Sequence, residues 1–369
     1  MTWHLFFLVW GEPFVGQVAR VTVPFLMMGG NIPALSADDR VVLHIYTDPE
    51  SRQALLKAVS PLSPWCAIDV RIFDDTAARA FHGPDFKYEL QRWCLRDLVG
   101  SLTEGSMVLL DSNFLLSDGT LSALAVRRRE GYRAVCVPVL RATTEPLCGL
   151  LAPALMNGAS VEARSLIEAA LNSLHHITKS FFVDETPFSP YPSQMSWRVE
   201  GGGFVTRNFL PHPLMVPVSS AFLRSQSTMD YDLTLRLADD DEIYAVTDSD
   251  EMLVVKISSE DHQAQRVDGR FAPTVENLGL FLLTCTNRRH RLFADAAAAF
   301  HSAPRDQRFD AVIAASQMMI DDAYAWIDML ASRPGQLDAR LLMYLKSHLG
   351  PIEDFMSPQL EPSALGLLR

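Results

Sequence analysis

Apolar segments of strand length alternate with segments of helical periodicity through the first 140 residues, and this alternation constrains the fold more than any other feature. Strands joined by helices predict an α/β protein with a mostly parallel sheet covered by helices on both faces. The expected strands are residues 5–10, 41–46, 68–73, 107–110 and 134–140. The expected helices are residues 14–28, 50–59, 86–102 and 121–130.

The remainder of the chain changes character twice. A helix at 162–181 precedes a series of short strands, and the final hundred residues have helical periodicity. The short strands are expected at 194–199, 204–209, 214–218, 242–246 and 252–257. The last helices are expected at 274–290, 294–299, 309–330 and 338–349. The 369 residues therefore predict three sections, 1–155, 156–265 and a C-terminal helical segment at 266–369.

The charge balance limits the partners of the chain. Lys and Arg number 32 against 44 Asp and Glu, so the net charge is -12. A general nucleic-acid binder needs a basic surface, and we therefore expect no nucleic-acid partner. A small phosphate ligand stays compatible, because a local pocket can be positive on an acidic protein. Lysine is scarce, which makes a lysine in a candidate site stand out.

The five cysteines and the N-terminal segment bear on the location of the protein. No C-x-x-C pair occurs, so neither a zinc cluster nor a dense disulfide framework is expected. The apolar run 5–10 is short and follows no basic residue, unlike a signal peptide. No run approaches the ~20 apolar residues of a membrane span. We predict a cytoplasmic protein, and peripheral attachment to a membrane stays open.

Polar or small residues follow four of the expected strands. Ligands of open α/β sheets bind at the carboxyl ends of the strands. At 107–119 an apolar strand leads into Asp111 and Asn113, which share one face of an extended segment. Two such oxygen ligands can hold Mg²⁺ or Mn²⁺; an Asx turn after a strand is the alternative interpretation.

The segment 108–119 resembles the D-x-D region of GT-A-type glycosyltransferases, which use nucleotide-sugar donors. The resemblance implies a GT-A-like, Rossmann-like fold in which 1–155 binds the nucleotide sugar and 156–265 binds the acceptor. It also implies a divalent metal, Mn or Mg, at Asp111. The family usually has Asp at the third position, where this chain has Asn113. A neutral amide binds a divalent cation more weakly, so Asp111 either binds the metal alone or contacts the sugar.

The resemblance implies roles for further residues. Trp10, Gly11 and Glu12 would lie near the nucleoside, and Asp75 would meet the base or ribose. Lys87 or Arg92, on one expected helix, would reach the diphosphate oxygens. His212, held between two prolines, would be a third metal ligand beside Asp111 and Asn113. Ser112, between those two residues, joins the expected donor-binding set.

An inverting glycosyltransferase also needs a carboxylate as general base on the acceptor hydroxyl. Asp230, Asp232, Asp248 and Asp250 are the candidates, and the sequence does not choose among them. A second interpretation makes 248–251 the D-x-D equivalent and leaves Asp111 structural.

The predicted function is transfer of a sugar from a nucleotide diphosphate donor to a glycan or other hydroxyl acceptor, in bacterial-type glycan biosynthesis. One alternative is a sugar-phosphate nucleotidyltransferase, which also needs a strand-end carboxylate and a metal. Another is a catalytically silent GT-A-like binding or scaffold protein. The C-terminal helices are a candidate surface for homo-oligomer formation.

Overall fold

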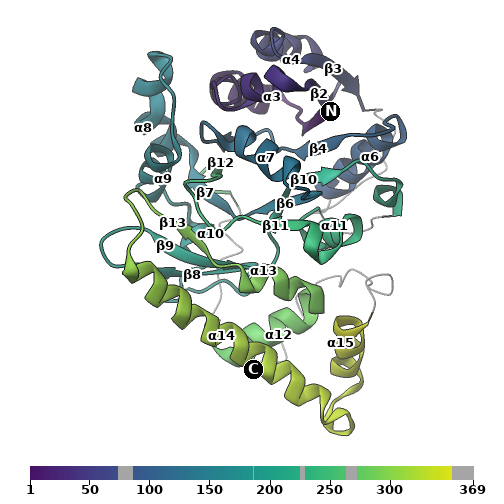
Figure 1. The fold of residues 1–369 in the computed structure, drawn as a ribbon, viewed down its shortest axis with the longest axis vertical. Coiled ribbons are helices and arrows are strands. Elements are labelled where there is room, and N and C mark those ends of the chain that lie inside the picture. Colours follow the sequence, from purple (N-terminus) through teal and green to yellow (C-terminus); the bar gives the residue numbers. More distant parts are fainter. Residues whose placement is uncertain (74–85, 186, 225–228, 263–271, 351–369) are drawn as a thin grey trace. The chain divides into compact units, whose positions relative to one another are not determined.

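The computed structural model describes residues 1–73, 86–185, 187–224, 229–262 and 272–350. The chain forms two compact units (Figure 1). Unit 1 contains Met1–Ser173 and His212–Ser259, and unit 2 contains Leu174–Pro211 and Glu260–Arg369. Each unit is therefore discontinuous in the sequence, and the predicted section 156–265 contributes to both.

Unit 1 is built on a mainly parallel sheet of seven strands within the described residues, in the order β11-β6-β10-β4-β1-β2-β3. Only β10 runs antiparallel to its neighbours in this sheet. The predicted fold class, α/β with a mostly parallel sheet and covering helices, is confirmed. The strands are β1 (Thr2–Leu8), β2 (Arg40–Thr47), β3 (Ala67–Ile72), β4 (Ser106–Leu109), β6 (Ala134–Val137), β10 (His212–Pro217) and β11 (Ile243–Ala245).

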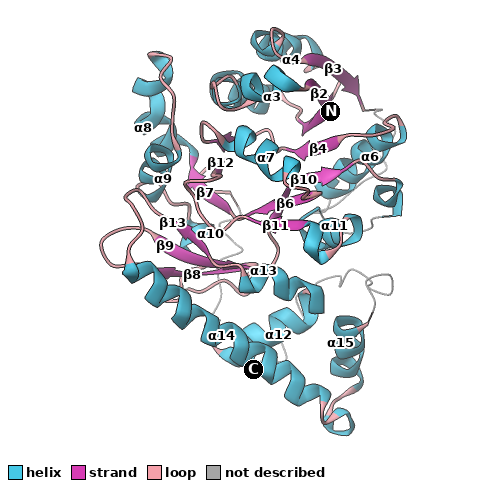
Figure 2. Ribbon diagram, viewed as in Figure 1, coloured by secondary structure: helices cyan, strands magenta, loops and turns pink. Residues whose placement is uncertain are grey.

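Alternate residues of these strands supply the two faces of the sheet. Helices cover this sheet (Figure 2). Leu5, Phe7 and Leu43 pack into one large core cluster with the helices of one face. The elements that line this cluster are α1 (Glu12–Gln17), η1 (Val18–Thr22), α2 (Val23–Leu26), α3 (Ile32–Asp38), α4 (Arg52–Val59), η2 (Ser60–Leu62) and α7 (Thr120–Arg129). The predicted helix 14–28 is interrupted by the π-helical turn η1 just before Pro24, whose nitrogen cannot donate a helical hydrogen bond.

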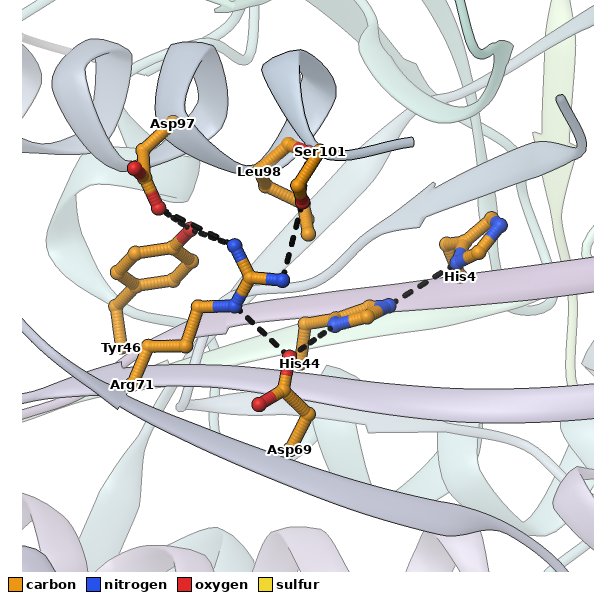
Figure 3. Close-up of polar contacts among 8 residues, drawn as sticks. All are labelled: His4, His44, Tyr46, Asp69, Arg71, Asp97, Leu98 and Ser101. Carbon is orange, nitrogen blue, oxygen red and sulfur yellow. Dashed lines mark hydrogen bonds and ion pairs between the residues drawn. The ribbon is translucent and has the colours of Figure 1, made fainter. Parts of the chain in front are cut away.

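A chain of polar side chains lies between the second face and α6 (Phe86–Gly100), as Figure 3 shows. His4 Nδ1 lies 3.0 Å from His44 Nε2, and His44 Nδ1 lies 2.9 Å from Asp69 Oδ2. Arg71 continues the chain by donating to Asp69 and to Asp97 of α6. Burial lowers the pKa of both histidines. These contacts tie three parallel strands to the helix that covers them.

A second sheet in unit 1 has the order β5-β12-β7, with β12 antiparallel to β5 and parallel to β7. The predicted strand 134–140 is wrong in one respect: it breaks at Pro138, and its halves β6 and β7 join different sheets. Proline cannot donate to a ladder, which favours a break there. The remaining elements of unit 1 are β5 (Phe114–Leu116), β7 (Val139–Thr143), β12 (Val254–Ser258), α8 (Thr144–Met156), α9 (Ala163–Leu171), η3 (Ser220–Arg224), α11 (Met229–Leu237) and η4 (Asp240–Glu242).

Unit 2 contains a three-stranded antiparallel sheet, β13-β9-β8, and a helical core in which Phe281, Ile320 and Tyr324 are buried. Its strands are β8 (Gln194–Arg198), β9 (Phe204–Asn208) and β13 (Ala298–Phe300). Its helices are α10 (His176–Lys179), α12 (Val275–Cys285), η6 (Arg288–His290), α13 (Arg291–Asp295), α14 (Gln307–Ala331), η7 (Pro334–Gln336) and α15 (Ala339–Leu349). Within the described part of the chain, no helix has the length and apolar character needed to cross a membrane.

Two helix predictions are wrong. The segment 294–299 ends α13 and then enters β13, where Phe300 stacks on Phe204 with ring centroids 4.6 Å apart. Strand pairing there outweighs the helical propensity of the alanine run. The segment 162–181 is broken between α9 and α10, and the ring of His175 accepts a hydrogen bond from the amide of Ile177 to cap α10. The elements α3, α8, α11 and β5 are not predicted from the sequence.

Candidate functional site

Asp111 and His212 lie at the same edge of the central sheet. Asp111 follows β4 after one further buried residue, Leu110. β10 runs antiparallel to β4 and β6, so its first residue, His212, lies where those two strands end. His212 pairs with Val137, the last residue of β6. This is the carboxyl edge of the parallel strands, where α/β folds bind ligands.

The carboxylate of Asp111 is held by two lysines. The Lys256 ammonium donates to Asp111 Oδ2, and Lys87 Nζ lies 3.7 Å from the same oxygen. The side chains of Asp111 and Lys256 are only 14% and 18% exposed, whereas that of Lys87 is 48% exposed. Burial alone would raise the pKa of Asp111, but the two ammonium groups hold it well below its usual range. Asp111 is therefore ionised, and the ammonium groups of Lys256 and Lys87 balance its negative charge.

Lys256 arrives at this edge from the second sheet. The register of β12 places it between Arg141 of β7 and Phe114 of β5. Paired residues on neighbouring strands share one face, so Lys256 and Arg141 stand side by side. The Lys256 ammonium lies 5.3 Å from the centroid of the Phe114 ring. Arg141 donates to Ser258 Oγ at 2.6 Å.

His212 makes contacts through both ring nitrogens. Its Nε2 donates to the Leu109 carbonyl oxygen at 2.8 Å, and its Nδ1 lies 3.2 Å from Asp230 Oδ1. Its ring also packs edge-on against Phe114, with centroids 4.9 Å apart. His212 is 7% exposed, whereas the Asp230 carboxylate is 51% exposed. The buried imidazole is thus in contact with a carboxyl group that is open to solvent.

The four candidate bases occupy different settings. Asp230 and Asp232 lie in the first turn of α11, but Asp232 is 2% exposed and paired with Arg236. Asp250 pairs with Arg164 of α9 at 2.6 Å. Asp248 accepts the backbone amide of Asp250 within their turn. Of the four, the described contacts connect Asp230 to His212 and hence to the edge that carries Asp111.

The three expected metal ligands do not fit a divalent cation as they are placed. The Asp111 carboxylate is already paired with Lys256 and Lys87. The Asn113 amide nitrogen donates to the Ile257 carbonyl oxygen at 2.7 Å, so this side chain joins β12 to the strand-end turn. The Nε2 atom of His212 donates a proton to a carbonyl and offers no lone pair there. An ammonium group lies where the sequence predicts the metal.

The residues expected near the nucleoside lie around the end of β1. Trp10 is partly exposed and makes edge contacts with Phe73 and Phe86, each with centroids 6.1 Å apart. Gly11 has a φ of 82° and donates its amide to Asp48 Oδ2 and Ser51 Oγ. Glu12 is exposed at the start of α1, and Asp75 lies outside the described residues.

The other residues expected to bind the donor differ in their contacts. Lys87 reaches Asp111, whereas Arg92 pairs with Glu89 of the same helix. The carbonyl oxygen of Ser112 accepts a hydrogen bond from Thr22 Oγ1 at 2.7 Å, which anchors the turn after Asp111. The structure therefore brings together Lys87, Asp111, His212 and Asp230 from the predicted set.

No role of Lys256 or Arg141 is predicted from the sequence. Each stands in a strand of otherwise mostly apolar residues, Val254–Ser258 and Val139–Thr143. A charged residue in a buried strand needs a partner, and this was the available signal. The partner could not be named, because Asp111 and Lys256 are 145 residues apart in sequence.

No protein-family model and no curated protein matches the sequence. Solved structures include distant likenesses. Staphylococcus aureus TarS, residues 1–349, is 11% identical with a TM-score of 0.39 over 94% of this chain and 84% of that one. The Pyrobaculum calidifontis mannosyltransferase PcManGT, in complex with GDP-Man and Mn2+, is 10% identical with a TM-score of 0.33 over 94% and 78%.

Mouse xyloside xylosyltransferase 1, in its apo form, is 9% identical with a TM-score of 0.29 over 37% of this chain, which spans 53% of that protein. At identities of 9–11%, these likenesses assign no chemistry to this chain.

Proposed function

We propose that this protein is a glycosyltransferase that moves a sugar from a nucleoside diphosphate donor to a hydroxyl acceptor. One observation carries the proposal: lysines from two separate elements contact a carboxylate at the ligand-binding edge of an α/β sheet, which also carries a second, solvent-open carboxylate. Arg141 stands beside one of these lysines. Positive groups there stabilise the charge that develops on a leaving diphosphate. The open carboxylate serves the acceptor.

Asp230 is the proposed general base. Its carboxylate takes the proton of the acceptor hydroxyl while that oxygen bonds to the anomeric carbon of the sugar. The bond from this carbon to the diphosphate oxygen breaks, and the diphosphate leaves with the electron pair. His212 donates from Nε2 to Leu109, so a neutral ring has a lone pair at Nδ1 that accepts a hydrogen bond from protonated Asp230. His212 is thus a positioning residue.

The nucleoside end of the donor is proposed to lie at Trp10. Its ring is partly exposed and is braced by Phe73 and Phe86 at nearly perpendicular angles of 89° and 86°. A braced aromatic ring offers a face on which a base can stack. Lys87 lies one residue after Phe86 in α6, which links the aromatic ring to the basic group at Asp111.

The first test is donor binding. Thermal shift with UDP, GDP, ADP and their sugar conjugates should raise the melting temperature for at least one donor, because a ligand at 100 times its Kd adds about 2.7 kcal/mol. Asp230→Asn should keep that shift and lose about 100-fold or more in transfer rate, as expected when a general base is removed. Asp241→Asn, at an exposed position of η4, is the matched control and should transfer normally.

The products separate the proposal from its alternatives. Release of a nucleoside diphosphate supports glycosyl transfer, whereas pyrophosphate as product would identify a sugar-phosphate nucleotidyltransferase. Donor binding without turnover would identify a silent binding protein, and no nucleotide binding would rule out both enzyme functions.

Self-association through the C-terminal helices and a cytoplasmic location stay predictions. The exposed Met318 and Met329 of α14 and Met343 of α15 support the first, since exposed apolar side chains favour association. Light scattering after size exclusion measures the oligomeric state directly. A monomer at high concentration would contradict the prediction.

A further inference from the structure

We propose that Lys256 and Lys87 neutralise the donor diphosphate in place of a divalent metal ion, so that the protein binds its nucleotide without a metal. The inference rests on the proposed function and concerns the same edge of the sheet. It means that the site needs no metal ion, whereas the resemblance seen in the sequence implies one.

The first support is the position of Lys256. Its ammonium donates to the carboxylate that the sequence analysis assigned to the metal. Both side chains are largely buried and come from strands or strand ends of two different sheets. A cation placed this way is part of the folded protein, and it would compete with a divalent ion for Asp111.

The second support is the arrangement of positive charge. Cross-strand pairing places Lys256 beside Arg141, so two cationic side chains occupy adjacent positions on one face of the second sheet. Two like charges at adjacent positions repel each other, and water screens them only partly because both side chains are partly buried. A bound dianionic group would offset that repulsion, since charge-assisted hydrogen bonds from Lys and Arg to phosphate are among the strongest.

The third support is the geometry of Lys87. Its ammonium lies 3.7 Å from Asp111 Oδ2, beyond ordinary hydrogen-bond distance, and the side chain is half-exposed at the start of α6. A flexible four-carbon stem lets such a group turn towards a phosphate oxygen at little cost. Two of the five lysines in 369 residues thus meet at one carboxylate.

Isothermal titration calorimetry of the full chain with UDP and GDP tests the inference, with each titration run in EDTA and in MnCl₂. The Kd in EDTA should lie within about twofold of the Kd in MnCl₂. Lys256→Met should weaken binding about tenfold or more in both buffers, and Lys87→Gln about fivefold, as expected for loss of a charge-assisted contact. Lys57→Gln, at an exposed position of α4, should bind as the unchanged protein does.

The outcomes separate the two proposals. Binding that appears only with MnCl₂ overturns the metal-independent site and leaves the glycosyltransferase standing. The absence of binding to either nucleotide in both buffers overturns the proposed function as well. Because Lys256→Met removes a buried partner, the half-exposed Lys87 provides the second variant, and unchanged affinity in Lys87→Gln contradicts the inference even if Lys256→Met fails to fold.

Discussion

A carboxylate buried beside an ammonium group depends on that partner, and Asp111 with Lys256 is such a pair. Removing one member leaves the other charge buried without full compensation, whereas removing both can cost much less. The pair is therefore part of the stability of unit 1 as well as of the proposed chemistry. Its side chains are less than one-fifth exposed, so solvent screens them only partly.

We expect Asp111→Asn to lower the free energy of unfolding by about 3 kcal/mol, the usual cost of breaking a buried ion pair. The double variant Asp111→Asn/Lys256→Met should recover part of that loss, because no uncompensated ammonium stays buried. Urea denaturation followed by circular dichroism measures both values. Strictly additive effects of the two single substitutions would show that the side chains are not coupled.

Individual side-chain roles were the least predictable part of the site. The spacing of Asp111 and Asn113 indicated a polar strand end, but the amide of Asn113 donates to the Ile257 carbonyl oxygen of β12, 144 residues later. Lys256 and Arg141 were missed for the same reason. Local spacing reports which residues share a face, and it does not report which distant strand will pair beside them.

At the scale of elements, the strands β1, β2 and β3 are joined by a polar chain as well as by their backbone ladders (Figure 3). Three contacts link Asp69, His44, His4 and the Glu104 carbonyl, with acceptors at both ends. Two neutral imidazoles supply only two N–H donors. While both rings are neutral, one of the three contacts therefore has no hydrogen atom between its two heavy atoms.

This chain predicts a pH dependence of stability. Burial lowers the pKa of His4 and His44 below the ordinary value of 6.5, so the folded state binds fewer protons than the unfolded chain. Their contribution is complete above pH 6.5 and is lost as the pH falls below it. Asp69 raises the pKa of His44, whereas Arg71 lowers the pKa of His44 and Arg40 lowers that of His4, so the net direction of both shifts is downward.

We therefore expect the urea concentration at the unfolding midpoint to decrease as the pH is lowered from 7.5 to 5.5. The decrease should be smaller in His4→Phe, which keeps a ring but removes one titrating group. Denaturation curves at half-unit intervals of pH measure both slopes. An equal slope in the two proteins would contradict this assignment.

Element prediction succeeded where the periodicity was long and local. The strands at 41–46 and 68–73 and the helices at 86–102 and 309–330 all appear, with ends shifted by one or a few residues. It failed where pairing between distant segments decides the outcome, as in β13. The alanines there adopt a strand because β9 offers an edge, which the segment itself does not encode.

At the scale of the whole molecule, the chain forms two units, each with its own buried core. Arg207 lies in the interior of unit 2. This arginine is 1% exposed in β9 and donates to Ser316, Gln317 and backbone carbonyls of unit 2, including that of Asp295. Burial lowers its pKa, and the surrounding acceptors satisfy its donors.

Arg207→Met should therefore destabilise unit 2 by about 3 kcal/mol or more, since several buried acceptors lose their donor. Hydrogen exchange should accelerate in β9 and α14 and stay unchanged in β1 and β2. Arg333→Met, at an exposed position in the same unit, is the control and should leave both patterns unchanged. Equal acceleration in β1 and β2 would show that the two units unfold together.

The placement of β10 has a consequence for synthesis of the protein on the ribosome. This strand lies between β4 and β6, yet its first residue is made 75 residues after the last residue of β6, from Val137 to His212. At ordinary elongation rates the delay is about 4–15 s. During that interval β4 and β6 each have an edge without its partner strand, and unpaired strand edges promote aggregation. β4 and β6 can be joined only after β10 has been synthesised, and β10 follows the first segment of unit 2 in the sequence. Slowing translation after residue 137 should therefore prolong the dependence of the nascent chain on chaperones.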